Sequence, residues 1–219
     1  GRKLCQIQKF KSVVFDNSVY SYVGFFKHKI DHNSIAYEIF NKEGPLAVLP
    51  SPSSNNKRCT FIYSTNNQTT YSEIQSIVKK CFSSSHGKII FDKKIHSYPV
   101  VPHFTKYNKK FIFIGDSLKS IHPVAGQGWN LGVKDIQTLS NLIDQYPLDS
   151  KIFNSIYYSR RMIEGSLYFG FTSLINFLYE NNNSLNKNLI KVGYRGLQKF
   201  SLFRDLFIKQ AMGRLNLIG

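Results

Sequence analysis

One segment near the middle of the chain has the pattern of a buried strand followed by a glycine-rich turn and a helix. Residues 111–114 are the wholly apolar run Phe-Ile-Phe-Ile, and Gly115 and Asp116 follow directly. A short apolar run of this kind is typical of a strand covered on both faces. A glycine at its end lets another group approach the main chain. The sequence therefore predicts a strand over 110–114 that ends in a turn, where the Asp116 carboxylate can accept hydrogen bonds.

The residues after this turn predict a bare helix N-terminus. Pro123, Gly126 and Gly128 lead into a helix that we expect from about Gly128 to Asp144, with Leu131, Ile136, Leu139, Leu142 and Ile143 facing inward. Glycines remove side chains from the main chain, and the free N–H groups of a first turn suit a carbonyl oxygen or an anion. A reduced flavin ring, which carries negative charge at its pyrimidine edge, is one such group.

The rest of the chain divides into a strand-rich first half and a helical second half. Aromatic and β-branched runs predict strands of an antiparallel meander at 13–15, 19–26, 35–40, 46–49, 60–64 and 88–95. A helix interrupts them, because apolar residues recur at helical spacing from Ile74 to Phe82 behind Ser72, which we expect to cap it. Further helices are predicted at about 150–179 and 189–212. The predicted fold class is α+β.

Charge and cysteine content restrict the partners that the chain could have. Lys and Arg number 29 against 13 acidic residues, a net charge of +16, so an anionic surface has to be considered. We expect no nucleic-acid partner, because neither an aromatic RNP-type motif nor a helix-turn-helix signature is present. The three cysteines and six histidines lack metal-ligand spacing, so the sequence predicts no metal site and favours a reducing, intracellular compartment. The apolar stretch 165–179 is too short and too polar to predict a membrane span.

The central segment resembles a motif of a known enzyme family. Its residues Ile114-Gly115-Asp116, His122-Pro123, Gly126-Gln127-Gly128, Asn130-Leu131-Gly132 and Asp135 resemble the second flavin-binding motif of the FAD-dependent aromatic hydroxylases. Within that group the chain is most similar to the ubiquinone-biosynthesis monooxygenases, which are relatives of p-hydroxybenzoate hydroxylase. The similarity extends to Ala36-Tyr37-Glu38 and Gly44-Pro45-Leu46-Ala47, and so covers most of the chain.

The resemblance implies roles for particular residues. Asp116 would bond the ribityl chain of FAD, and Gly115 would lie against its pyrophosphate. The isoalloxazine ring would be lined by His122, Pro123 and the main chain of Gly126, Gln127 and Gly128. Asn130 and Leu131 would offer groups near its pyrimidine edge. No catalytic acid or base of the protein is implied.

The resemblance also implies an architecture and an activity. Residues 1–105 would form the substrate-domain sheet with its covering helix, 106–148 the C-terminal strand and helix of an FAD-binding domain, and 149–219 the C-terminal helices. The family's N-terminal Rossmann unit with its GxGxxG fingerprint is missing, so we expect the chain to be part of a longer enzyme. That enzyme would use NAD(P)H and O2 to hydroxylate an aromatic, polyprenylated phenol on the path to ubiquinone. Other proteins of that path or a membrane surface are the expected partners, in the cytoplasm or peripheral to an inner membrane.

One departure from the family pattern supports a different reading. Ser117-Leu118-Lys119 stand where the family has Ala-Ala-His. Leu118 would crowd the nucleotide, and Lys119 would lie near a phosphate or point to solvent. A chain that cannot hold FAD for this reason, and because the nucleotide-binding half is missing, would be a non-catalytic, basic interaction or scaffold module derived from such an enzyme.

Overall fold

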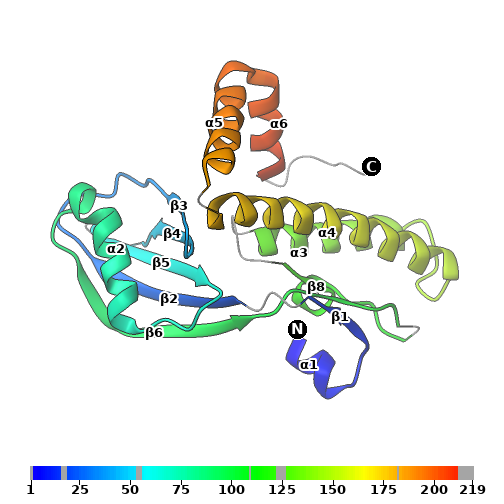
Figure 1. Ribbon diagram of the computed structural model, residues 1–219. Coiled ribbons are helices and arrows are strands. Elements are labelled where there is room, and N and C mark those ends of the chain that lie inside the picture. Colours follow the sequence, from blue (N-terminus) through cyan, green and yellow to red (C-terminus); the bar gives the residue numbers. More distant parts are fainter. Residues whose placement is uncertain are drawn as a thin grey trace. The chain divides into compact units, whose positions relative to one another are not determined.

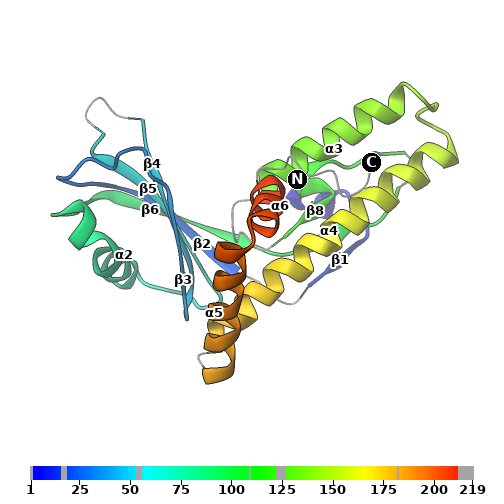
Figure 2. The same cartoon turned by 90° about the horizontal axis from the view of Figure 1, so that it is seen from above.

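The computed structural model describes residues 2–15, 19–52, 56–108, 110–121, 127–181 and 183–211, and the chain falls into two compact units. The first, called here the helical unit, comprises Gly1–Asn17, Val101–Leu178 and Asn182–Gly219. The second, the sheet unit, comprises Ser18–Val100 and Tyr179–Asn181. Figures 1 and 2 show the elements of both units.

The elements follow one another in this order: α1 (Arg2–Ile7), β1 (Ser12–Val14), β2 (Val19–Lys27), β3 (Tyr37–Asn41), β4 (Gly44–Pro50), β5 (Arg58–Thr65), α2 (Tyr71–His86), β6 (Ile90–Val100), β7 (His103–Thr105), the 3-10 turn η1 (Gly115–Ser117), β8 (Lys119–Ser120), α3 (Gln127–Ile143), α4 (Lys151–Glu180), α5 (Ser184–Lys199) and α6 (Ser201–Ala211).

The sheet unit is an antiparallel five-stranded sheet in the order β3-β4-β5-β2-β6, with α2 packed on one face (Figure 1). The alternating side chains of β2, β4 and β5 supply Phe26, Leu46 and Phe61 to the core. The apolar stripe of α2 packs against them through Ile74, Val78 and Phe82, so the predicted periodicity of this helix is confirmed. Gly44 adopts φ +133°, a conformation that favours glycine, where β3 turns into β4.

Thr70, rather than Ser72, caps α2. The Thr70 hydroxyl accepts the Glu73 N–H, and the Glu73 carboxylate accepts the Thr70 N–H at 2.8 Å, which together form a capping box. These hydrogen bonds lower the pKa of Glu73. The helix begins at Tyr71, one residue before the predicted cap, because the side chains of Thr70 and Glu73 together satisfy the main-chain N–H groups of both residues.

This difference leads to a test of the helix boundary. We expect Thr70→Ala to lower the free energy of unfolding by about 1 kcal/mol, the usual cost of losing an N-cap. Ser72→Ala lies inside the helix, and we expect it to change that free energy by less than about 0.5 kcal/mol. Urea unfolding followed by circular dichroism measures both variants. An equal loss in both would contradict the assignment of the cap.

The helical unit packs α3 and α4 side by side over a small three-stranded sheet in the order β1-β7-β8 (Figures 1 and 2). Its main core joins the first helix and the central segment to α3 and α4, through Cys5, Phe113, Leu118, Leu142, Phe153, Tyr157 and Tyr158. At the C-terminal end of α4, the Asn186 side chain donates to the Phe177 carbonyl oxygen at 3.2 Å and so ties α5 to α4.

The fold class is confirmed: antiparallel sheets come first and helices follow. Several details of the prediction are wrong. β1 pairs with β7 in the small sheet, with Ser12 opposite Thr105, and does not belong to a single meander. The helix predicted at 189–212 is two helices that meet at Phe200, and α1 was not predicted. Ile136 and Ile143, expected to face inward, are exposed.

The boundaries of the units also differ from the three predicted ranges. The first residues, through Asn17, belong to the helical unit, and the sheet unit ends at Val100 apart from Tyr179–Asn181. The N-terminal segment joins the helical unit because β1 pairs with β7 and because Cys5 packs against Phe113 and Leu118. The assignment of the sheet to substrate binding stays a prediction. Among the described residues, no helix is both long and apolar enough to cross a membrane.

Candidate functional site

The apolar segment 111–114 is extended but is not a strand, which corrects the sequence-based prediction. Tyrosine side chains of α4 hold its main chain: the Tyr157 hydroxyl donates to the Phe113 carbonyl oxygen at 2.8 Å, and the Phe113 N–H donates to the Tyr158 oxygen at 3.3 Å. Phe113 is buried, whereas Phe111 is 52% exposed. One face of the segment is therefore covered by the protein core, and its hydrogen bonds go to side chains instead of a neighbouring strand.

The turn that follows is held against α3. Gly115 has φ +56°, and its N–H donates to Asp135 Oδ2 at 2.8 Å. A Cβ on Gly132 of α3 would lie 3.6 Å from the Gly115 Cα, so the helix and the turn pack closely. The Asp116 side chain is exposed at the tip of this turn. The turn and the first half of α3 are thus neighbours.

A cluster of buried charges lies behind the turn. Lys119 donates to Asp135 Oδ1, Lys134 donates to Glu164 at 2.8 Å, and Arg161 donates to the same glutamate. Arg161 also lies 3.6 Å from Asp135. Burial raises the pKa of Asp135 and lowers the pKa of Lys119, and their ion pair opposes both shifts.

This cluster corrects two expectations from the sequence, those for Leu118 and Lys119. Leu118 is fully buried in the core beside Phe113 and Leu142, so it does not reach the surface of the turn. Lys119 is buried against Asp135 and neither points to solvent nor lies free for a phosphate. Arg161 of α4 is also buried in the cluster. The structure therefore removes the reason for expecting Leu118 and Lys119 to exclude FAD.

The remaining predicted site residues fall into two groups. His122, Pro123 and Gly126 lie outside the described residues, and of Gln127 only the main chain, which begins α3, is described. Gly128 and Asn130 lie in the first turn of that helix. The Leu131 side chain is buried with Ile121 and Tyr168, so only its main chain is available to a ligand. Trp129 is 79% exposed and does not belong to the core.

The residues present fit FAD. A Cβ on Gly115 or on Gly128 would meet no atom of the described residues within 4 Å, so with respect to these residues open space lies beside both glycines. The α3 helix has 17 residues, and the N–H groups of its first turn have no partner within the helix. Together with the exposed Asp116 carboxylate, these features offer main-chain donors and one acceptor to a ligand that bears both hydroxyl groups and negative charge.

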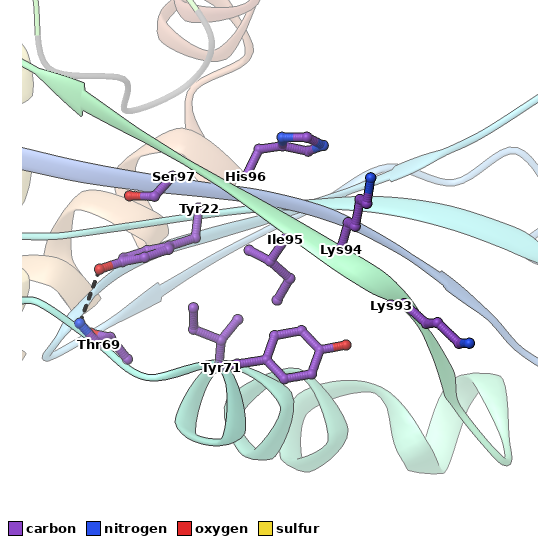
Figure 3. A pocket seen from close by; sticks show the side chains of 9 residues that line it. Tyr22, Thr69, Tyr71, Lys93, Lys94, Ile95, His96 and Ser97 are labelled. Atoms are coloured by element: carbon purple, nitrogen blue, oxygen red, sulfur yellow. Dashed lines mark hydrogen bonds between the residues drawn. The ribbon is translucent and has the colours of Figure 1, made fainter.

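A separate pocket of about 540 Å³ lies in the sheet unit, between β6 and the start of α2 (Figure 3). Ile95 points toward Tyr71, whereas Lys94 and His96 project on the other side of β6. The Tyr22 hydroxyl accepts the Thr69 N–H at 3.0 Å on its wall. Of the predicted flavin-site residues that the structure describes, none lines this pocket.

The structure also brings together three residues that the sequence did not connect. His28, Cys59 and His86 are buried in the sheet unit, and their potential ligand atoms lie within 4.8 Å of one another. Burial lowers the pKa of His28 and His86 and raises the pKa of Cys59 to about 11. No spacing rule finds this cluster, because 31 residues separate His28 from Cys59 and only the pairing of β2 with β5 makes them neighbours.

Comparisons with known proteins identify relatives of this chain. Residues 12–145 match a family described as FAD binding domain. The chain is 27% identical over 214 residues to the ubiquinone hydroxylase UbiM of Neisseria meningitidis, covering 92% of this chain and 46% of that protein. It is 24% identical to the ubiquinone hydroxylase UbiL of Rhodospirillum rubrum, covering 87% and 47%. The chain thus spans about half the length of these relatives.

Solved structures show the same fold. The p-nitrophenol 4-monooxygenase PnpA of Pseudomonas putida superposes with a TM-score of 0.67 at 12% identity, over 95% of this chain and 56% of that one. The flavin-dependent halogenase CmlS superposes with a TM-score of 0.62 at 12% identity, over 84% and 37%.

Proposed function

Because the chain belongs to the FAD-binding domain family, we propose that it is part of a flavin-dependent monooxygenase that hydroxylates an aromatic ring. The observation that carries this proposal is the turn at Gly115 and Asp116, which is held against α3 at Gly132 and Asp135. The relatives UbiM and UbiL are named ubiquinone hydroxylases. The GxGxxG fingerprint does not occur in this sequence, so the nucleotide half of the site would come from another segment of the full-length protein.

FAD, when bound, supplies the redox chemistry that activates O2 for transfer to the ring. The chain's own residues would bind and orient it. The Asp116 carboxylate, exposed on the turn, would accept hydrogen bonds from the ribityl hydroxyl groups. The N–H groups at the start of α3 and the positive end of its dipole would face the pyrimidine edge, where they stabilise negative charge. Gly128 would leave the main chain open for this contact, and Trp129 is exposed beside it.

For this enzyme we propose a polyprenylated phenol as the substrate and NAD(P)H as the reductant. The names of the relatives support the substrate class. The chain contributes no acid or base to this scheme, because the oxygen substituent of a phenol itself activates the ring.

A peripheral membrane location is part of the same proposal, since a polyprenyl substrate partitions into lipid. The chain carries a net charge of +16. Along α4, one helical face leaves apolar side chains exposed at Ile163, Leu167, Phe171, Leu174 and Phe177. Flotation of the intact protein with anionic vesicles tests this location, and a protein that stays at the bottom of the gradient would exclude it.

The intact gene product tests the activity. We expect it to purify with FAD, to oxidise NAD(P)H faster when a polyprenyl phenol is present, and to place one atom of ¹⁸O2 in the hydroxylated product. A purified protein that binds no FAD would contradict the proposal that FAD is its cofactor. A protein that holds FAD but gives no labelled product would contradict the monooxygenase activity alone.

Asp116 is the residue whose replacement tests the cofactor contact. We expect Asp116→Ala to weaken FAD binding by about 10- to 100-fold, which corresponds to the loss of a hydrogen bond to a charged group. Asp144→Ala removes an exposed carboxylate just beyond α3 and serves as the control. Titration of the apoprotein with FAD, followed by flavin fluorescence, measures both. Equal affinities in the two variants would rule out the contact.

A further inference from the structure

The cluster of His28, Cys59 and His86 has the composition of a soft-metal site. Cys59 and His86 are buried, as is His28, which lies at the end of β2. The Cys59 Sγ lies 3.4 Å from His28 Nε2, and the rings of His28 and His86 have centroids 4.8 Å apart. Thiolate and imidazole together are the ligands that select Zn²⁺ and Cu⁺ over harder cations.

Hydrogen bonds fix His28 in the form that a metal requires. Its Nδ1 lies 2.6 Å from the Ile30 carbonyl oxygen, so Nδ1 carries the proton and donates it. The lone pair is then on Nε2, which is the atom that faces Cys59. A main-chain carbonyl that orients a histidine in this way is the usual outer partner of a metal ligand.

Main-chain hydrogen bonds keep the three potential ligand residues next to one another before any ion binds. The His86 carbonyl oxygen accepts the N–H groups of Lys29 and Ile30, each at 3.1 Å. The His28 N–H donates to the Lys57 carbonyl oxygen at 3.0 Å, and Cys59 pairs with Phe26 across β2 and β5. The end of α2 and the ends of two strands are thus tied together around the cluster.

The neighbouring His32 is not a fourth ligand. Its Nδ1 accepts the Ser34 N–H at 3.0 Å, so the neutral ring carries its proton on Nε2. The walls of the cluster are aromatic, since the rings of Phe26, Tyr37 and Phe82 lie against His86 with centroids 5.3 to 6.4 Å away. The site therefore offers two nitrogen ligands and one sulfur ligand in an apolar surrounding.

We propose that His28, Cys59 and His86 bind one thiophilic d¹⁰ cation, Zn²⁺ or Cu⁺. Binding forms bonds from the metal to His28 Nε2, to an imidazole nitrogen of His86 and to Cys59 Sγ, and releases the thiol proton of Cys59 to solvent. No electron is transferred. The site would cross-link the ends of β2, β5 and α2, and it contains none of the residues of the flavin site.

The test is metal binding by the intact gene product after chelation under reducing conditions. Zn²⁺ competition with a chromophoric chelator and Cu⁺ competition with bicinchoninate decide which ion it prefers. We expect one equivalent to bind more tightly than about 1 μM. Difference spectra with Co²⁺ should show a sulfur-to-cobalt charge-transfer band. A protein that binds neither Zn²⁺ nor Cu⁺ this tightly overturns the proposal.

Matched variants locate the site. Cys59→Ser and His28→Gln should each weaken binding by at least about 100-fold, more than the loss of an outer-sphere partner. Cys81→Ser and His96→Gln remove a thiol and an imidazole elsewhere in the sheet unit and should bind like the wild type. Wild-type affinity in Cys59→Ser would overturn the proposal. If that variant does not fold by circular dichroism, the wild-type Co²⁺ spectrum decides, and a spectrum without the charge-transfer band overturns it.

Discussion

Asp135→Ala is expected to lower the free energy of unfolding by about 3–5 kcal/mol, because it leaves buried cations without their partner. Asp135 is fully buried, and its carboxylate contacts both Lys119 and Arg161. The same carboxylate accepts the Gly115 N–H, which would lose its acceptor. The substitution should therefore also loosen the turn that carries Asp116, and we expect FAD binding to weaken with it. Urea unfolding and FAD titration measure the two effects.

Two further variants make this prediction specific. Asp144→Ala removes an exposed carboxylate near the same helix and should change stability by less than about 0.5 kcal/mol. The double variant Asp135→Ala/Lys119→Met removes both members of a buried pair, so it should recover a large part of the loss. If the free energy of unfolding of the single variant falls by less than about 1 kcal/mol, the buried pair does not stabilise the fold as proposed. The same conclusion follows if the double variant is no more stable than the single one.

Gly165→Leu is expected to destabilise the protein by about 3 kcal/mol relative to the same substitution at Gly170. A Cβ on Gly165 would lie 2.6 Å from Phe104 and 2.9 Å from the Lys119 side chain, whereas one on Gly170 would meet nothing within 4 Å. Both glycines lie on α4, so the gain in helix propensity on replacing glycine is the same at both positions. The difference between the variants therefore isolates the close packing at Gly165.

Thermal and urea unfolding of the two variants give the comparison. Gly170→Leu should be as stable as the wild type or slightly more stable, because leucine is the better helix former. Gly165→Leu should also disturb the Lys119 and Asp135 pair, since the added side chain occupies the space of the lysine stem. Equal stability of the two variants would show that α4 can move away from Phe104 at little cost.

The local elements of the fold were largely readable from the sequence. The spacing of Ile74, Val78 and Phe82 predicted α2, and the apolar spacing of 128–144 predicted α3, because helical periodicity is a short-range property. The residues Gly115, Asp116 and Gly128 identified the turn and helix start for a similar reason: each is defined by its neighbours in the chain. The resemblance that these residues carry was then confirmed by the family match over residues 12–145.

Strand pairing and side-chain burial were harder to predict from the sequence. The run 111–114 has the composition of a strand, yet tyrosines from α4, more than forty residues away, take its hydrogen bonds. Lys119 was expected near a phosphate or in solvent, because charged side chains lie at the surface unless a partner meets them in the core. Its partner, Asp135, lies on α3, and nothing local to Lys119 indicates it.

The sequence by itself determined α2, α3 and α4, the turn at Gly115 and Asp116, and the family to which they point, because these depend on residues close together along the chain. The tertiary structure alone decided that β1 pairs with β7, that Leu118 and Lys119 face inward, and that His28, Cys59 and His86 meet. Such contacts join residues far apart in sequence, and the free energy of burying them depends on how whole elements pack. The turn and helix of the proposed flavin site were therefore predictable from the sequence, while the buried charges beside them and the candidate metal site were not.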